Sequence, residues 1–273
     1  MIATLDEIVV ATRLRVAEAR RSADLCFLER QALEHAPRAF RNKLVQTAES
    51  GLAIIAELKK ASPSKGLIRA DFQVGSLAQE LEAAGAAALS VLTDREFFQG
   101  SLENLRAASS ATQLPCLRKD FILDEFQLLE ARAYGADAVL LIVAALSQAQ
   151  LTALVKRARE YDLDVQCEVH NEEELKRGSD CGCELIGINS RDLRSFKVDL
   201  ATAFRLAERF REGVVWVAES GIQSGNDIAR LRAAGYQAFL IGESLMKAPS
   251  PGEALRMLIA EASREQLAVP TRK

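Results

Sequence analysis

Eight short runs of apolar residues recur along the chain, and each is apolar on both of its faces. They are rich in Val, Ile, Leu and Ala and lack the strict alternation of a strand with one face in water. This pattern is typical of strands in a parallel sheet, because helices cover both faces of such a sheet. The predicted strands lie near residues 53–58, 88–92, 114–118, 138–143, 164–168, 184–189, 214–219 and 238–242.

Helical patterns fill the gaps between these runs. In three segments the end of a helical pattern is followed by a glycine and then by an apolar run, and the glycines are Gly85, Gly135 and Gly235. Glycine suits the position after a helix, where the backbone often needs a positive φ. Helix starts are predicted at four polar residues that precede helical patterns, namely Asp124, Ser147, Asn171 and Ser250.

Strand and helix alternate eight times, which predicts a (β/α)8 TIM barrel. A doubly wound open sheet is the alternative, but the sequence lacks the Gly-rich turn with which such sheets bind nucleotides. Residues 1–50 lie outside the alternation and have amphipathic helical patterns, so we expect an N-terminal helical extension packed on the barrel. Because no Pro-, Gly- or Ser-rich linker separates it, we expect residues 1–273 to form a single domain. The tail after residue 264 is expected to be irregular.

The composition is that of an ordinary globular protein. Of the 273 residues, 49% are hydrophobic and 27% are charged, and the net charge is -3 with a pI near 5.7. This acidic balance argues against nucleic acid as a partner. The opening segment has no apolar run long enough for a signal peptide or a membrane span. We therefore expect a cytoplasmic protein, monomeric or weakly dimeric, without nucleic-acid or membrane partners.

The cysteines and histidines do not predict a metal site. The five cysteines are scattered and odd in number, so reduced thiols are expected. Cys181 and Cys183 are the only close pair, but a metal knuckle needs a wider spacing and a second pair. No motif places His35 or His170 on a metal site, and His170 is expected to be structural.

Polar residues mark the carboxyl ends of the predicted strands, which is where barrels carry their active sites. Charged side chains are costly at the end of a buried strand unless a site needs them. Because side chains two apart on a strand share a face, Glu57 and Lys59 point the same way, as do Asn189 and Arg191. We therefore expect these groups to meet at the barrel mouth. The polar residues concerned are Glu57, Lys59, Lys119, Glu168, Asn189, Arg191, Glu219 and Ser220.

A phosphate site is predicted after the last two strands. Gly221 and Gly242 each follow an apolar run directly. In barrels these loops commonly bind phosphate through backbone N–H groups, and glycine lets the main chain approach the anion closely.

Seven motifs in this order resemble those of the indole-3-glycerol-phosphate synthase family: "IAELKKASPSKG", "VLTDREFFQGS", "LRKDFILDEFQLLEARAYGADAVLLI", "EVHNEEEL", "IGINSRDL", "AESGI" and "IGESLM". The resemblance implies a (β/α)8 barrel with extra N-terminal helices. It also implies the conversion of 1-(2-carboxyphenylamino)-1-deoxyribulose 5-phosphate into indole-3-glycerol phosphate, with loss of CO2 and water. The implied partner is thus a small phosphorylated substrate, and the implied chemistry needs neither a metal nor an organic cofactor.

The resemblance also implies roles for individual residues. Lys119 is the acid that protonates the alkoxide formed when the aryl carbon attacks the ketone, since lysine is charged at neutral pH. Glu168 is a base, with Glu57 and Lys59 close by. Which carboxylate and which lysine serve which step stays open, and Lys59 is expected to hold the substrate carboxylate, to act in dehydration, or both.

The remaining implied site residues form three groups. Those expected to make polar contacts with the substrate are Ser62, Asn189, Arg191, Glu219 and Ser220. Those expected to form an apolar wall for the aromatic ring are Phe98, Phe121, Leu140, Ile142 and Leu193. Those expected to offer backbone donors to phosphate are Gly221, Gly242 and Glu243, and the Glu243 carboxylate should point away from the anion because two anions in contact repel.

Two other functions stay open at this point. Phosphoribosylanthranilate isomerase is a related phosphate-binding barrel, but it uses a Cys base on its first strand, where this sequence has Glu57 and Lys59. A barrel that has lost activity and acts as a scaffold is the other alternative, and the retained polar residues argue against it.

Overall fold

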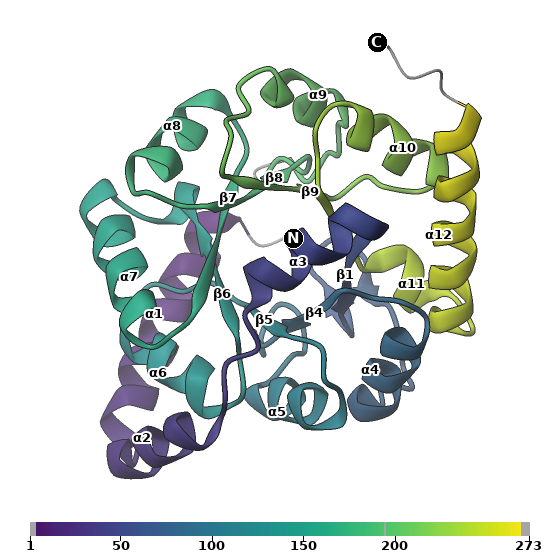
Figure 1. Cartoon of the computed structure of the whole chain (residues 1–273). Helices are drawn as coiled ribbons and strands as arrows, with labels where there is room; N and C mark the ends of the chain where they lie inside the picture. Colours follow the sequence, from purple (N-terminus) through teal and green to yellow (C-terminus); the bar gives the residue numbers. More distant parts are fainter. Residues whose placement is uncertain (1–3, 194, 269–273) are drawn as a thin grey trace.

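The computed structural model describes residues 4–193 and 195–268, with side chains through residue 265. Its centre is a closed barrel of eight parallel strands, in which β1 pairs with both β4 and β10 to close the ring (Figure 1). The barrel strands are β1 (Ala53–Leu58), β4 (Ala88–Leu92), β5 (Cys116–Lys119), β6 (Ala138–Ile142), β7 (Asp164–Val169), β8 (Leu185–Asn189), β9 (Val215–Glu219) and β10 (Ala238–Ile241). The predicted (β/α)8 barrel is confirmed.

Helices surround the barrel, and those that precede β10 connect its strands (Figure 1). They are α4 (Val74–Ala83), α5 (Leu102–Ala111), α6 (Phe126–Ala133), α7 (Gln148–Glu160), α8 (Glu172–Asp180), α9 (Ala201–Ala207), α10 (Gly225–Ala233), α11 (Glu243–Lys247) and α12 (Pro251–Ala268). Gly85, Gly135 and Gly235 have φ of 97°, 86° and 104°, as predicted for a residue that follows a helix. A small hairpin of β2 (Ala61–Ser62) and β3 (Gly66–Leu67) lies in the connection after β1.

The helix starts agree with three of the four predictions. Ser147 and Asn171 are N-caps whose side chains accept hydrogen bonds from the third helical residue, and Ser250 directly precedes α12. The prediction at Asp124 is wrong by one residue, because α6 begins at Phe126. Asp124 still accepts the Phe126 N–H at 2.8 Å and so satisfies the start of that helix.

Residues near both ends of the chain are helical. The prediction that the chain is irregular after residue 264 is wrong for the residues up to 268, because they belong to α12. Residues 269–273 lie outside the described part of the chain. The N-terminal extension consists of α1 (Leu5–Ser22), α2 (Leu25–Glu34) and α3 (Phe40–Ser50). Figure 1 shows α3 lying across one open end of the barrel and α2 lying beside α6.

The third helix of the extension closes the amino-terminal end of the barrel. Phe40 and Leu44 are fully buried and pack with inward-facing residues of the strands, among them Ile55, Val217 and Ala238. Burying side chains of this size contributes about 1.5–3 kcal/mol each relative to leaving them in water. The strand ends at the opposite side of the barrel are therefore the ones that stay open.

The first helix of the extension reaches from α6 to the open end of the barrel. Val16 packs with Phe126 of α6. Ile8, nearer the start of α1, packs with Phe121, which follows β5 in the chain. Between them, Arg15 lies 3.4 Å from Asp94 and 3.2 Å from Asp120, two buried carboxylates that follow β4 and β5. Apolar packing and ion pairs together fix α1 beside the barrel mouth.

The expectation of reduced thiols is wrong for two cysteines, because the structure pairs Cys167 and Cys183 as a disulfide. Cys167 lies on β7 and Cys183 precedes β8, and the pairing of these adjacent strands brings the two Cα atoms within 6.5 Å. The 16-residue separation hides this contact in the sequence, where Cys181 is the closer neighbour of Cys183. Cys26, Cys116 and Cys181 are free.

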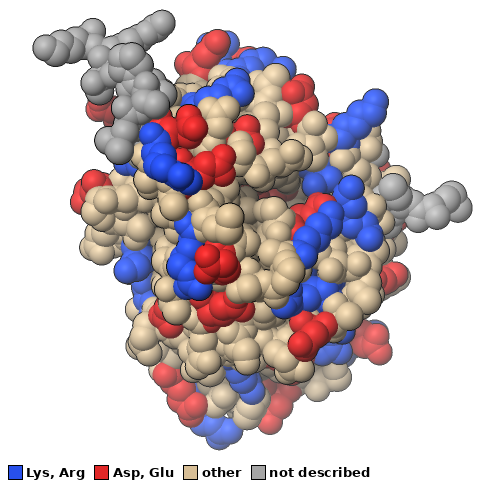
Figure 2. Space-filling view, turned by 90° about the vertical axis from the view of Figure 1, so that its right-hand side faces the viewer, with Lys and Arg blue, Asp and Glu red and all other residues tan. Residues whose placement is uncertain are grey.

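The surface carries both signs of charge. On the face that Figure 2 shows, Lys and Arg are interspersed with Asp and Glu, which matches the small net charge of -3. Within the described residues, no helix has both the length and the apolar character needed to cross a bilayer.

Candidate active site

A cavity of about 560 Å³ opens at the carboxyl ends of the barrel strands. The structure brings every residue predicted for the site to the lining of this cavity. These residues are Glu57, Lys59, Ser62, Phe98, Lys119, Phe121, Leu140, Ile142, Glu168, Asn189, Arg191, Leu193, Glu219, Ser220, Gly221, Gly242 and Glu243. Strands far apart in the sequence thus supply one continuous surface.

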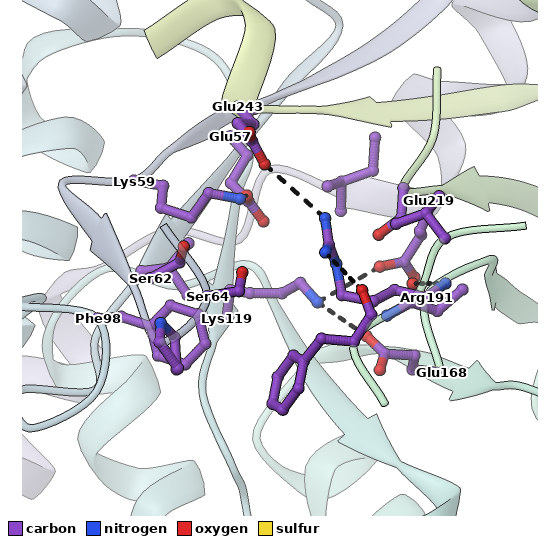
Figure 3. Close-up of a pocket in the computed structure, with 18 of the residues that line it drawn as sticks. Glu57, Lys59, Ser62, Ser64, Phe98, Lys119, Glu168, Arg191, Glu219 and Glu243 are labelled. Carbon is purple, nitrogen blue, oxygen red and sulfur yellow. Dashed lines mark hydrogen bonds and ion pairs between the residues drawn. The ribbon is translucent and has the colours of Figure 1, made fainter. Parts of the chain in front are cut away.

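Lys119 ends β5 and lies between two carboxylates (Figure 3). Its Nζ is 2.8 Å from Glu168 Oε2 and 3.3 Å from Glu219 Oε2. Burial alone would lower the pKa of Lys119, but the charges of Glu168, Glu219 and Glu57 raise it above its ordinary value. The cavity therefore contains a fixed ammonium group with a proton to donate.

Glu168 lies on β7 with a cation on each side. One oxygen contacts Lys119, and the other, Oε1, is 3.3 Å from Nε2 of His170. Burial alone would raise the pKa of Glu168, but Lys119 and His170 hold it well below its usual range. Glu168 is therefore an ionised carboxylate at neutral pH.

His170 is more than the structural residue that the sequence suggested. Its Nδ1 is 2.8 Å from Oε2 of Glu174, so the ring bridges a carboxylate of α8 and the carboxylate of Glu168 in the cavity. Burial lowers the pKa of His170, but these two carboxylates outweigh it and raise the pKa to about 10. The ring is consequently a second cation behind Glu168. This contact has no signal in the sequence, because it depends on the side-chain directions at the end of β7.

Glu219 ends β9 and is almost completely buried. Its Oε1 accepts a hydrogen bond of 2.8 Å from Nε2 of Gln166, and its Oε2 faces Lys119. Burial, together with the charges of Glu168 and Glu57, raises the pKa of Glu219 to about 7, against the opposing effects of Lys119 and Gln166. This carboxyl can therefore change its protonation state near neutral pH.

Glu57 and Lys59 form a close ion pair at the end of β1, with Oε1 and Nζ 2.6 Å apart (Figure 3). Gly242, after β10, packs directly on Glu57, because a Cβ at residue 242 would lie 2.7 Å from the Glu57 Cβ. The predicted reason for this glycine was close approach to an anion. The structure adds a second reason, which is room for the Glu57 side chain.

Apolar side chains line another side of the cavity. Phe98 and Phe121 lie with ring centroids 6.4 Å apart, and Leu140 packs in the same cluster. Ile8 and Leu5 of α1 also line the cavity, which sequence reasoning missed. The pattern of α1 indicates that it has an apolar face, but not which surface that face covers.

The turn after β9 has an unusual backbone. Ser220 and Gly221 have φ of 63° and 84°, so two consecutive residues are left-handed. A side chain at residue 221 would meet Val198, since a Cβ there would lie 2.8 Å from Val198 Cγ1. Turns of irregular backbone can gather N–H groups into a concave anion site.

Cationic side chains gather at the same end of the cavity. Glu243 is 3.8 Å from Arg191 (Figure 3). It is also 2.6 Å from Nζ of Lys247, so its carboxylate is paired with cations. Lys65 and Lys247 line the cavity and were missed, because lysines in a loop and on a short helix look like solvated surface groups. Asn189 accepts the N–H of Arg191 at 3.0 Å and fixes the chain after β8.

Among the residues that the structure describes, no three His, Cys, Asp or Glu side chains are grouped so that they could hold a metal ion. The groups available to the cavity are an ammonium between carboxylates, a second ammonium paired with Glu57, an apolar wall and an end rich in cations. Such a set can move protons, hold an aromatic ring and bind an anion.

Comparison with known proteins gives a consistent result. The family model for indole-3-glycerol phosphate synthase matches residues 5–258. A protein from Koribacter versatilis (strain Ellin345) named indole-3-glycerol phosphate synthase is 58% identical over 259 residues, which cover 95% of this chain and 100% of that protein. One of the same name from Dechloromonas aromatica (strain RCB) is 47% identical over 261 residues, covering 94% and 98%.

Solved structures show likeness of fold. A 3-hexulose-6-phosphate synthase matches with a TM-score of 0.62 at 16% identity and covers 77% of this chain and 99% of its own. A thiamine phosphate pyrophosphorylase from Pyrococcus furiosus matches with a TM-score of 0.59 at 19% identity, covering 82% and 98%. At this level of identity the match concerns the barrel alone.

Proposed function

The chain belongs to the indole-3-glycerol phosphate synthase family, and from that premise we propose that the cavity at the barrel mouth is its active site. The reaction there is ring closure of 1-(2-carboxyphenylamino)-1-deoxyribulose 5-phosphate, with loss of CO2 and water, to indole-3-glycerol phosphate. The observation that carries the assignment is the meeting of Lys119, Glu168, Glu57 and Lys59 from three strands in one cavity.

In the first step the aryl carbon that bears the carboxylate attacks the ketone carbon of the sugar. A C–C bond forms, the carbonyl electrons move to oxygen, and Lys119 Nζ gives its proton to the developing alkoxide. The neighbouring carboxylates keep this lysine charged until that moment, and a positioned acid of this kind commonly supplies about 10²–10⁴-fold in rate. The carboxylate then leaves as CO2, and its bonding electrons restore the aromatic ring.

Proton donation by Lys119 prepares the second half of the reaction. When Lys119 becomes neutral, Glu168 loses the nearer of its two cationic neighbours, so its pKa rises and it becomes a better base. It then accepts the proton released as the new five-membered ring becomes aromatic. The hydroxyl group leaves as water after protonation by Lys59, which Glu57 orients at 2.6 Å.

The other lining residues position the substrate. Phe98, Phe121, Leu140, Ile142 and Leu193 face the aromatic ring, and Ile8 extends this wall. Ser62, Asn189, Arg191, Glu219 and Ser220 supply polar contacts. The main chain of Gly221, Gly242 and Glu243 binds the phosphate, with the Glu243 carboxylate paired to Lys247.

The N-terminal extension and the barrel act together in this function. Residues 1–273 act as a single barrel domain, in which α1 and α3 contact opposite ends of the barrel. The protein works as a monomer or a weak homodimer in the cytoplasm, where phosphorylated sugars are made.

The test is to add the carboxyphenylamino-deoxyribulose phosphate to the purified protein and to follow indole fluorescence. The Glu168→Gln variant should lower kcat by about 10²-fold or more with little change in KM, because the amide cannot take up a proton. Glu172→Gln on the exposed start of α8 is the matched control and should behave as wild type. A folded wild-type protein without product would overturn the function, and a change in KM alone would exclude Glu168 as the base.

A further inference from the structure

Gln166 is a polar residue in an apolar layer of the barrel. It lies on β7 two residues before Glu168 and is completely buried. The inward residues two positions before Lys119 and Glu219 are Leu117 and Val217, which belong to the inner apolar core. A buried amide is costly unless it is hydrogen-bonded, so the presence of Gln166 at this depth needs a reason.

The partner of Gln166 lies across one strand of the barrel. Its Nε2 donates to Oε1 of Glu219 at 2.8 Å, and β7 and β9 are separated by β8. Gly187 of β8 makes this contact possible. A Cβ at residue 187 would overlap Glu219 Oε1 and lie 3.0 Å from Gln166 Nε2. The missing side chain therefore leaves the space in which the amide and the carboxylate meet.

The hydrogen bond fixes which oxygen of Glu219 faces the reacting groups. With Oε1 held by Gln166, Oε2 lies 3.3 Å from Lys119 Nζ and has no hydrogen bond within the described part of the chain. The charged groups that act on Glu219 are Lys119 from β5, Glu168 from β7 and Glu57 from β1. Among the residues that the structure describes, Gln166 is the one neutral group that donates a hydrogen bond to Glu219.

We propose that Gln166 is a positioning residue, which keeps the Glu219 carboxyl aimed at Lys119 through the opening that Gly187 leaves in β8. This role rests on the proposed function, because Lys119 is the acid that Glu219 would support. A hydrogen bond to a charged acceptor is stronger than one to a neutral acceptor, so the amide favours the carboxylate over the carboxylic acid. Without it, Glu219 takes up a proton more readily and its side chain is free to turn from Lys119.

The test replaces Gln166 by Met, which has similar length and no amide. With 13C-labelled glutamate, the carboxyl resonance that disappears in Glu219→Gln identifies Glu219, and its titration is followed by NMR. We expect the midpoint to move up by about one pH unit in Gln166→Met. In the fluorescence assay we expect a roughly tenfold lower kcat, a KM within about twofold of wild type, and an upward shift of the pH-profile limb that follows Glu219.

Two further variants make the result specific. Leu117→Met changes the same inner core from β5, a strand that pairs with neither β7 nor β9, and it should leave both the midpoint and kcat unchanged. Gln166→Asn keeps an amide that is too short to reach Glu219, so it should behave like Gln166→Met, and it serves if the Met variant does not fold.

The two readouts separate this inference from the proposed function. An unchanged Glu219 midpoint in both Gln166 variants overturns the positioning role, even if the wild-type protein is fully active. A wild-type protein that makes no indole product overturns the proposed function, whereas a shifted midpoint in the same sample still supports the contact between Gln166 and Glu219.

Discussion

Replacement of Lys119 by Met removes the cation that two buried carboxylates share. Lys119 Nζ lies 2.8 Å from Glu168 and 3.3 Å from Glu219, and the side chains of both glutamates are at most 2% exposed. Removing one partner of a buried ion pair typically costs about 3–5 kcal/mol, because the remaining charge is left without compensation. The loss here should depend on pH, since the carboxylates can relieve it by taking up a proton.

The direction of this pH dependence follows from the pKa of Glu168. In the wild-type protein burial would raise this pKa, but Lys119 and His170 hold it below the unfolded value of about 4.3, so ionised Glu168 stabilises the fold above that pH. In Lys119→Met the pKa rises above the unfolded value. The folded variant then holds more protons than the unfolded chain, and its stability falls as the pH rises from about 5 to 8.

The assay is urea unfolding of both proteins at pH 5 and pH 8, with kcat measured at pH 7.5. At pH 8 the free energy of unfolding of Lys119→Met should be lower than that of wild type by about 3–5 kcal/mol, and at pH 5 by about 1–2 kcal/mol. The kcat should fall by about 10²–10⁴-fold, because the acid for the first step is gone. An equal loss of stability at both pH values would refute the electrostatic reasoning, and a near-normal kcat would exclude Lys119 from the mechanism.

Three other substitutions probe separate parts of the molecule. His170→Ala removes the second cation beside Glu168, so kcat should fall about tenfold. A pH profile of kcat identical to that of wild type would contradict an electrostatic role of His170. Asp137→Ala leaves hydrogen-bond donors from the N-terminal extension and from β5 without their acceptor. The free energy of unfolding in urea should therefore fall by about 3–5 kcal/mol, and a variant as stable as wild type would show that these contacts are dispensable. Gly242→Ala pushes a Cβ against Glu57, so kcat should fall, while the circular dichroism spectrum should stay that of the folded protein. Unchanged kinetics would show that the backbone at the end of β10 shifts to make room for the Cβ.

The barrel could be predicted from the sequence because the periodicity of a parallel barrel is local. Each strand is apolar on both faces and each is followed by a helix, so every unit carries its own signal. Three predicted strand starts are too early: β8 and β9 begin one residue later than predicted, and β5 begins at Cys116 instead of residue 114. Pro115 has no N–H to donate to a sheet, although its carbonyl accepts the N–H of Leu89.

The candidate site could be predicted for the same reason, and its missing parts have a physical cause. Residues at strand ends share a location whatever their distance in sequence, so Glu57 and Glu168 could be placed at one mouth. Contacts that depend on side-chain direction or on packing from outside the barrel leave no periodic signal. Ile8 enters the cavity from α1, and the partner of Gln166 is set by a space in the next strand.

The closure of the amino-terminal end of the barrel by α3 has a consequence for folding during translation. Phe40 and Leu44 leave the ribosome well before the residues that cover them, which include Val217 of β9 and Ala238 of β10. Until some two hundred more residues have been translated, these side chains have no native binding surface and are exposed to the partners that nascent chains meet. We therefore expect chains interrupted before β10 to leave the extension undocked and to be prone to aggregation.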